Sequence, residues 1–178
     1  MMSAYPKHDI RNVVCLDGIW SFEFLGAVDP IKVKPSKVVC NGTMPVPMAF
    51  DATTAYAGKR GTAVYRTTLR VPAQTDAFVH FAGAGLWSSI WIDGKKISDQ
   101  FDSYLPFRVP VPKSNAVIRT LDVVIDNQFS YERNPVQLDY YDWYQHGGIT
   151  RPVHLHILPQ TWIADAKKIG RASCRERV

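Results

Sequence analysis

The sequence lacks the features that mark several protein classes. Its 178 residues contain no run of about 18 apolar residues, so no membrane-spanning helix is expected. Residues 1–11 lack the apolar core of a signal peptide, which favours a cytoplasmic protein and leaves a periplasmic or secreted one open. The three cysteines, Cys15, Cys40 and Cys174, fit neither a disulfide framework nor a metal-binding spacing. We expect Cys15 and Cys40 to be buried thiols.

The formal net charge of +5 does not indicate a nucleic-acid partner. Residues 169–178 match the conceptual translation of a short-read sequencing adapter, and Lys168 can complete the match. We interpret residues 168–178 as non-native and expect them to pair with no strand, the alternative being a genuine basic tail. Residues 169–178 contain three arginines and one glutamate, so excluding them lowers the net charge from +5 to +3. The remaining basic residues are scattered, without the stripe and stacking aromatics of a nucleic-acid interface.

Helical periodicity is scarce, whereas short alternating runs recur. Residues 63–72 are the clearest strand, with Tyr65 and Leu69 on one face and Arg66 on the other. The dipeptide Asp93-Gly94 favours a type I′ hairpin turn. Comparable runs occur at 16–24, 78–81, 107–111, 121–127 and 153–157. About eight to ten such strands with turn residues between them predict one all-β domain over residues 1–167, a jelly-roll β-sandwich.

The segment 140–151 carries the strongest functional signal. Four aromatic residues surround Asp142, and Gly147 and Gly148 follow them. The apolar faces of a sugar ring stack on aromatic side chains, and sugar hydroxyls need a charged acceptor. The two glycines permit backbone angles with positive φ. This pattern suits sugar binding, but from this segment alone we favour the structural alternative, in which the aromatics cap a β-sandwich and Asp142 caps a turn.

Other polar pairs allow both a functional and a structural interpretation. His154 and His156 share a strand face and could begin a metal site. Zinc needs about three or four ligands and no third is apparent, so we expect a solvated strand face. Asp126 and Asn127 are too few for calcium, which takes about six to eight oxygens, so we expect a strand-end turn. The sequence therefore predicts neither a metal nor a cofactor.

Seven motifs follow one another along the chain. They are Asp-Gly-Ile-Trp-Ser-Phe (17–22), Met-Pro-Val-Pro-Met-Ala-Phe (44–50), Tyr-Arg-Thr-Thr-Leu-Arg-Val-Pro (65–72), Ile-Trp-Ile-Asp-Gly-Lys (90–95), Tyr-Leu-Pro-Phe (104–107), Val-Ile-Asp-Asn (124–127) and Asp-Trp-Tyr-Gln-His-Gly-Gly-Ile-Thr-Arg (142–151). Each is weak alone, but their order resembles glycoside hydrolase family 2, in its β-glucuronidase and β-galactosidase branch. The resemblance covers residues 16–167. It implies the amino-terminal sugar-binding domain, a jelly roll like the galactose-binding domains.

The resemblance also implies partners in the same polypeptide. Family members continue into an immunoglobulin-like domain and a (β/α)₈ barrel. The barrel holds both glutamates of the retaining mechanism, which places two carboxylates about 5 Å apart. We therefore expect the chain alone to be inactive. It would be the non-catalytic domain of a retaining β-glycosidase acting on terminal β-linked sugars, in an enzyme that could form homo-oligomers. The alternative is a freestanding carbohydrate-binding or interaction module.

Site residues are carried over from the same motif. The resemblance implies that Asp142 reaches into the barrel mouth and binds the sugar hydroxyls. Trp143, Tyr144 and His146 are the further substrate-binding residues that it implies. Arg151 matches the family's arginine after the Gly-Ile turn, and we interpret it as structural, holding the loop through a carboxylate or carbonyl groups. The residues between Asp142 and Gly147 differ from those of other members, which leaves the exact glycoside open.

Overall fold

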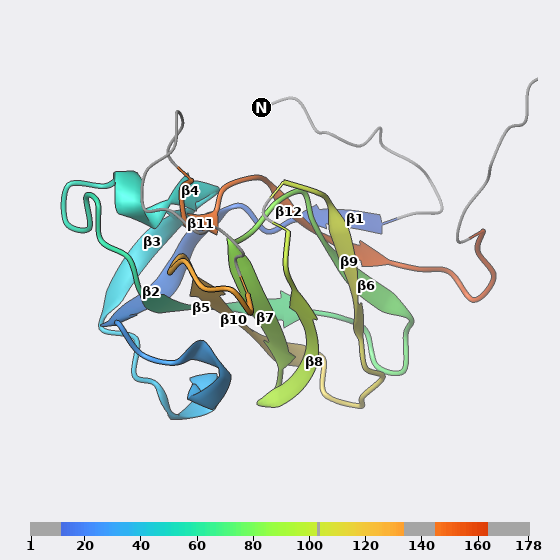
Figure 1. The fold of residues 1–178 in the computed structure, drawn as a ribbon. Coiled ribbons are helices and arrows are strands. Elements are labelled where there is room, and N and C mark those ends of the chain that lie inside the picture. Colours follow the sequence, from blue (N-terminus) through green and yellow to red (C-terminus); the bar gives the residue numbers. More distant parts are fainter. Residues whose placement is uncertain (1–11, 103, 134–144, 164–178) are drawn as a thin grey trace, which may run out of the picture.

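A computed structural model gives the fold of the chain and describes residues 12–102, 104–133 and 145–163 (Figure 1). The strands in these ranges are β1 (Asn12–Cys15), β2 (Gly18–Gly26), β3 (Gly42–Val46), β4 (Met48–Ala49), β5 (Thr62–Arg70), β6 (Ala77–Phe81), β7 (Trp87–Ile92), β8 (Lys95–Gln100), β9 (Phe107–Val111), β10 (Ile118–Asp126), β11 (Gly148–Ile149) and β12 (Val153–Ile157). Short 3-10 helices accompany them: η1 (Pro30–Lys32), η2 (Pro35–Lys37) and η3 (Phe50–Ala52). No helix in the described ranges is long and apolar enough to cross a membrane. The tail 168–178 lies outside those ranges, so the domain boundary before it stays a prediction.

Two antiparallel sheets form a β-sandwich (Figure 1). One has six strands in the order β3-β2-β5-β10-β7-β8, and the other has four in the order β1-β12-β6-β9. A two-stranded ribbon joins β11 to β4. Strands far apart in the sequence lie side by side, as β12 does between β1 and β6. The predicted all-β jelly-roll sandwich is confirmed.

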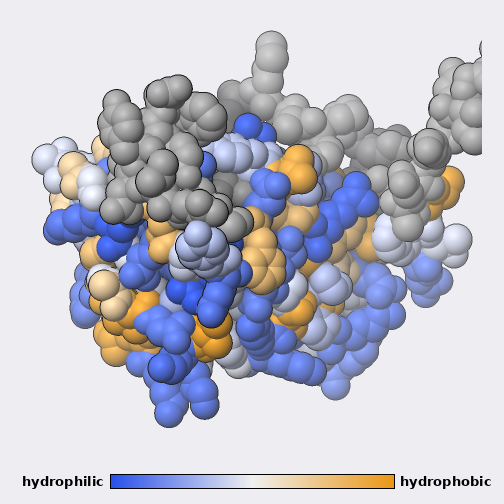
Figure 2. Space-filling model, viewed as in Figure 1, coloured by the Kyte–Doolittle hydropathy of each residue, from blue (hydrophilic) through white to orange (hydrophobic). Residues whose placement is uncertain are grey.

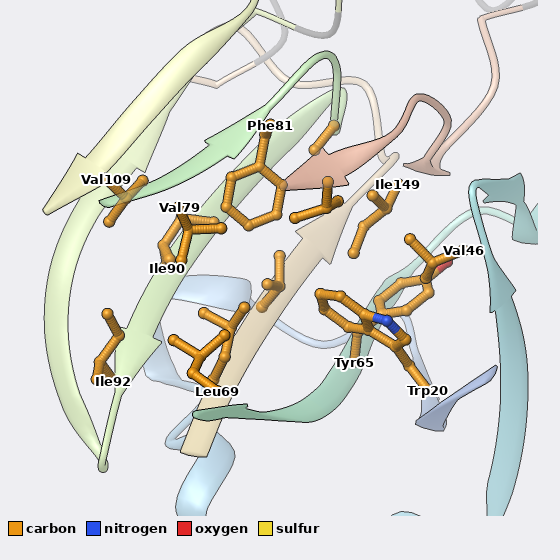
Figure 3. Close-up of a cluster of buried hydrophobic side chains, with 14 of the residues drawn as sticks. Trp20, Val46, Tyr65, Leu69, Val79, Phe81, Ile90, Ile92, Val109 and Ile149 are labelled. Carbon is orange, nitrogen blue, oxygen red and sulfur yellow. The ribbon is translucent and has the colours of Figure 1, made fainter. Parts of the chain in front are cut away.

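The hydrophobic core lies between the sheets, where the inward-facing residues of the strands meet. Trp20 and Phe22 of β2 are each 1% exposed, whereas Ser21 between them is exposed. Figure 3 shows Tyr65 of β5 on the side of the larger sheet and Phe81 of β6 on the side of the smaller one. The alternation in the sequence therefore identified the core correctly, because a strand directs successive side chains to opposite faces. On the surface in Figure 2, hydrophobic residues are interspersed among hydrophilic ones.

The hairpin turn between β7 and β8 forms as predicted. Asp93 has a φ of 49° and Gly94 a φ of 73°, the left-handed values that a type I′ turn needs at both positions. Asp93 also accepts a hydrogen bond from the Thr120 backbone N–H at 2.7 Å and pairs with Arg119. These contacts tie the turn to β10.

The outer face of the six-stranded sheet is covered by the segment 29–40. Arg66 of β5 pairs with Asp122 of β10, with 2.6 Å between Nε and Oδ1. The same guanidinium donates to the carbonyls of Pro35 at 2.6 Å and Val38 at 3.2 Å. Burial raises the pKa of the Asp122 carboxyl above its ordinary value of 3.8, although the hydrogen bond from Arg66 acts in the opposite direction. The ion pair thus fastens the covering segment to the sheet.

Two expectations about individual side chains are wrong. His154 and His156 are each 6% exposed rather than solvated. Their strand, β12, is flanked on both sides, and the Phe78 ring of β6 stacks on His156 with 4.5 Å between ring centroids. Cys15 is exposed rather than buried because it lies on β1, an edge strand. Alternation shows which residues share a face, but not whether neighbouring side chains cover that face.

The pair of histidines gains no support as a metal site. Among residues 12–102, 104–133 and 145–163, no three potential metal ligands lie close enough together to hold an ion. The His156 imidazole instead packs in an aromatic cluster beside β6, where His80 also contacts it edge to face.

The substitution Asp122→Asn should change how stability depends on pH. Because the folded pKa of Asp122 is raised, the folded chain binds more protons than the unfolded chain just above pH 3.8. The stability contributed by this carboxyl is fully present below its unfolded pKa and falls as the pH rises through the folded pKa. We expect Asp122→Asn to lower the free energy of unfolding, measured with urea, by more at about pH 3 than at about pH 7. Asp76→Asn is the control for the removal of one surface charge. A decrease in unfolding free energy that is larger for Asp122→Asn at about pH 7 than at about pH 3 would contradict the expectation.

Candidate functional site

The segment 140–151, which carries the functional signal in the sequence, joins the sandwich at Gly147 and Gly148. In the β11–β4 ribbon, Gly148 pairs with Ala49, and it also bridges Gly85. The Phe50 backbone N–H donates to the Gly147 carbonyl at 3.0 Å. The chain directly after residues 140–146 is therefore fixed to two other parts of the fold.

The two glycines are needed for different reasons. Gly148 has a φ of +135°, and a Cβ there would lie 2.5 Å from the Met48 carbonyl oxygen. Gly147 lies outside the left-handed region, but a Cβ there would lie 2.4 Å from the Asn127 Cβ. The expectation of positive φ is thus correct for Gly148 and wrong for Gly147, where close approach of another side chain excludes a Cβ.

A buried carboxylate holds this turn. The Asp51 side chain, on η3, has no exposed surface. Its Oδ2 accepts hydrogen bonds from the Gly147 backbone N–H at 3.0 Å and from Asn127 Nδ2 at 2.8 Å. Its Oδ1 lies 3.0 Å from His146 Nδ1. Two of the three partners, His146 and Gly147, belong to the motif 142–151, so Asp51 fixes the place where that motif joins the sandwich.

Asn127 extends the network to the loop before β5. It is fully buried, and its Oδ1 accepts from the Gly61 backbone N–H at 2.7 Å. Arg60 donates to the Asn127 carbonyl at 2.8 Å and to the Gln145 carbonyl at 3.3 Å. The Arg60 guanidinium also lies 3.8 Å from the centroid of the Phe129 ring. These contacts tie the end of β10 to the loop before β5.

Tyr65 is a further titratable group beside this network. Its side chain is fully buried in the core. Burial raises the pKa of its hydroxyl well above the ordinary value, and the charge of the nearby Asp51 carboxylate raises it further. Tyr65 therefore remains an uncharged core residue at neutral pH.

His146 borders a pocket of about 490 Å³ beside the β11–β4 ribbon. The volume falls within the roughly 300–1,000 Å³ typical of small-molecule sites. An apolar part, an aromatic ring and several polar groups line it together, a mixture that suits a polar ring compound such as a sugar. The lining residues are Pro47, Met48, Ala49, Tyr104, His146, Thr150 and Arg151.

Arg151 connects two loops at the rim of this pocket. Its Nη1 donates to the Tyr104 carbonyl at 3.2 Å, and its backbone N–H donates to the Gly83 carbonyl at 3.3 Å. The sequence predicted that this arginine holds the loop through a carboxylate or carbonyl groups. The hydrogen bond to a carbonyl supports that interpretation.

Of the four predicted substrate-binding residues, the structure describes His146. Its side chain is 45% exposed at the pocket. Asp142, Trp143 and Tyr144 lie outside the described residues, so their role stays a prediction. Sequence reasoning missed Asp51 because it is 95 residues from His146 and no local pattern joins the two. The one signal that could have indicated it is its place directly after the motif 44–50.

Comparison with known proteins gives a consistent set of relatives. No family model matches the chain. A β-glucuronidase of Streptococcus agalactiae serotype V is 26% identical to it, over 92% of this chain and 30% of that protein. The chain thus spans about a third of the length of the curated relatives it matches.

Solved structures show the same partial correspondence. A β-glucuronidase from an uncultured Clostridium species has a TM-score of 0.75 and 25% identity, over 89% of this chain and 31% of that one. A GH2 β-galacturonidase from Eisenbergiella tayi bound to galacturonate has a TM-score of 0.69 and 25% identity, over 88% of this chain and 26% of that one. The similarity therefore extends over most of the chain.

The substitution Gly148→Ala should destabilise the chain by about 2–4 kcal/mol, because it combines backbone strain with a clash against a carbonyl oxygen. Gly58→Ala is the matched control: its φ is +69°, but a Cβ there meets nothing within 4 Å. Backbone strain alone should cost that variant about 1–2 kcal/mol. Urea unfolding of both variants measures the difference, and equal losses would contradict the close approach at Gly148.

Proposed function

We propose that this chain, the amino-terminal β-sandwich domain of a family 2 glycoside hydrolase, forms one wall of the sugar site of a retaining β-glycosidase. The observation that carries the proposal is the pocket beside His146. The motif 142–151, which carries the family resemblance, meets β4 there. A surface of the domain that bears the family motif is thus also hollowed and lined in part by polar side chains.

The catalytic carboxylates are proposed to lie in further domains of the same polypeptide. Retaining hydrolysis needs an acid and a nucleophile about 5 Å apart across the glycosidic bond. No residue that lines the pocket in the described part of the chain is an acid. Asp51, the carboxylate nearest to His146 in that network, is buried and already binds three partners. It is therefore inaccessible as a nucleophile.

The segment before Gly147 is proposed to contact the sugar. Asp142 would accept hydrogen bonds from sugar hydroxyls, and Trp143 and Tyr144 would stack on the ring. His146 would contribute a further hydrogen bond from the pocket. The hydrogen bonds of Gly147 with Asp51 and Phe50 support this role, because binding residues need a rigid attachment to keep their geometry.

A terminal β-linked uronic acid is the proposed sugar. The matched relatives are β-glucuronidases and a β-galacturonidase, whose substrates carry a carboxylate. The pocket offers Arg151 as its permanently charged lining residue, which complements an anion rather than a neutral sugar.

Purified alone, the chain should not hydrolyse aryl β-glucuronides, because it lacks the pair of catalytic carboxylates. It should also bind glucuronate weakly, since one wall buries only part of a ligand. Release of the aryl group by the chain, compared with the same chain extended from its source DNA beyond Lys167, tests this directly. Repeatable turnover by the isolated chain would refute the proposal, and tight sugar binding without extension would favour a freestanding binding module.

In the extended enzyme, Asp142→Ala should lower kcat/KM by roughly ten- to a hundredfold. A hydrogen bond to a charged group contributes about 1.5–3 kcal/mol, and that contribution is lost. Thermal stability should change little, because the carboxylate is proposed to face the substrate. Glu132→Ala removes an exposed carboxylate on the turn at residues 131–133 and serves as the control. Near-normal kinetics with a loss of about 1 kcal/mol or more in stability would show instead that Asp142 caps a turn.

A further inference from the structure

The pairing of Asp51 with His146 has a chemical consequence beyond holding the chain. An ionised carboxylate can only accept hydrogen bonds, so the hydrogen between Asp51 Oδ1 and His146 Nδ1 belongs to the imidazole. A neutral imidazole carries one hydrogen on its two nitrogens. The contact with Asp51 therefore selects the form of His146 that is protonated on Nδ1 and has an acceptor at Nε2.

The orientation of the ring is restrained by the same contact. Asp51 is enclosed and cannot turn toward a different partner without leaving the Gly147 N–H and Asn127 Nδ2 unsatisfied. His146 is 45% exposed and lines the pocket. Because Nδ1 faces Asp51, the opposite edge of the ring, which bears Nε2, points away from Asp51.

A purely structural role would not require a histidine at this place. The Gly147 N–H and Asn127 already satisfy Oδ2, and the backbone of the turn is held by Phe50 and Arg60 as well. An imidazole whose protonated nitrogen faces a buried acid is the arrangement that enzymes use to orient a histidine toward a ligand. Asp51 therefore fixes both the tautomer and the ring orientation of His146 at this pocket.

We propose that Asp51 is a positioning residue that holds His146 as the Nδ1-protonated tautomer and directs Nε2 to accept a hydrogen bond from a sugar hydroxyl in the pocket. The second half of this proposal, the hydrogen bond from a sugar hydroxyl to Nε2, rests on the sugar-binding function proposed above. Its first half, the tautomer, concerns this chain alone. The two halves are therefore measured separately.

The tautomer is read by long-range proton–nitrogen NMR of the 178-residue chain labelled with ¹⁵N-histidine. The chain has five histidines, and His146→Gln identifies the signals of His146. Above the pH at which the ring becomes neutral, the wild-type chain should show His146 protonated on Nδ1. Asp51→Asn should remove this preference, because an amide can present a donor to the ring.

Asp122→Asn is the matched control, since it also removes a buried carboxylate but lies in the network with Arg66. It should lower stability without changing the His146 tautomer. If Asp51→Asn does not fold, the wild-type spectrum decides alone. A wild-type His146 protonated on Nε2, or an equal change in both variants, would overturn the positioning role.

The ligand half is tested by titrating D-glucuronate into the same proteins. Asp51→Asn and His146→Gln should each raise Kd by about fivefold, the effect of one lost hydrogen bond, whereas Asp122→Asn should leave Kd unchanged. Unchanged Kd in the first two variants would overturn the ligand half. A wild-type chain that binds no glucuronate but shows the expected tautomer would contradict the proposed sugar site and support the role of Asp51 in orienting His146.

Discussion

The candidate end of the sandwich depends on one buried carboxylate. An ionised group removed from water costs several kcal/mol unless hydrogen-bond donors replace the water. Asp51 receives such donors from His146, Gly147 and Asn127. Asp51, Asn127 and the adjacent pair His146–Gly147 come from three separate parts of the chain, and the carboxylate joins all three. Loss of Asp51 would leave two buried donors, the Gly147 N–H and Asn127 Nδ2, without this acceptor at once.

The hydrogen-bond network around Asp51 connects the packed core to the pocket. The strand β10 ends at the network, and η3 begins with Phe50, a fully buried core residue. The pocket then lies between the ribbon β11–β4 and the loop that contains Tyr104. A site attached in this way keeps its geometry because it inherits the stiffness of the packed sheets. This attachment supports the proposed function, in which the domain presents sugar-binding groups to catalytic residues of other domains.

The sequence predicted those features that are encoded locally. Alternation placed Trp20 and Phe22 in the core, and Asp93-Gly94 predicted its turn, because side-chain direction and turn angles depend on adjacent residues. Features that depend on contacts between distant segments were missed. The burial of His156 depends on Phe78, and the role of Asp51 depends on His146. The close approach of Asn127 to Gly147 is likewise invisible in either motif alone.

The central claim is that the end of the sandwich around His146 contacts the sugar. Amide chemical shifts of the chain, followed during titration with D-glucuronate, test this claim most directly. The account predicts that the perturbed amides cluster at the residues that line the pocket: Met48, Ala49, Tyr104, His146, Thr150 and Arg151. Perturbations confined to the four-stranded sheet, or to the covering segment 29–40, would contradict it.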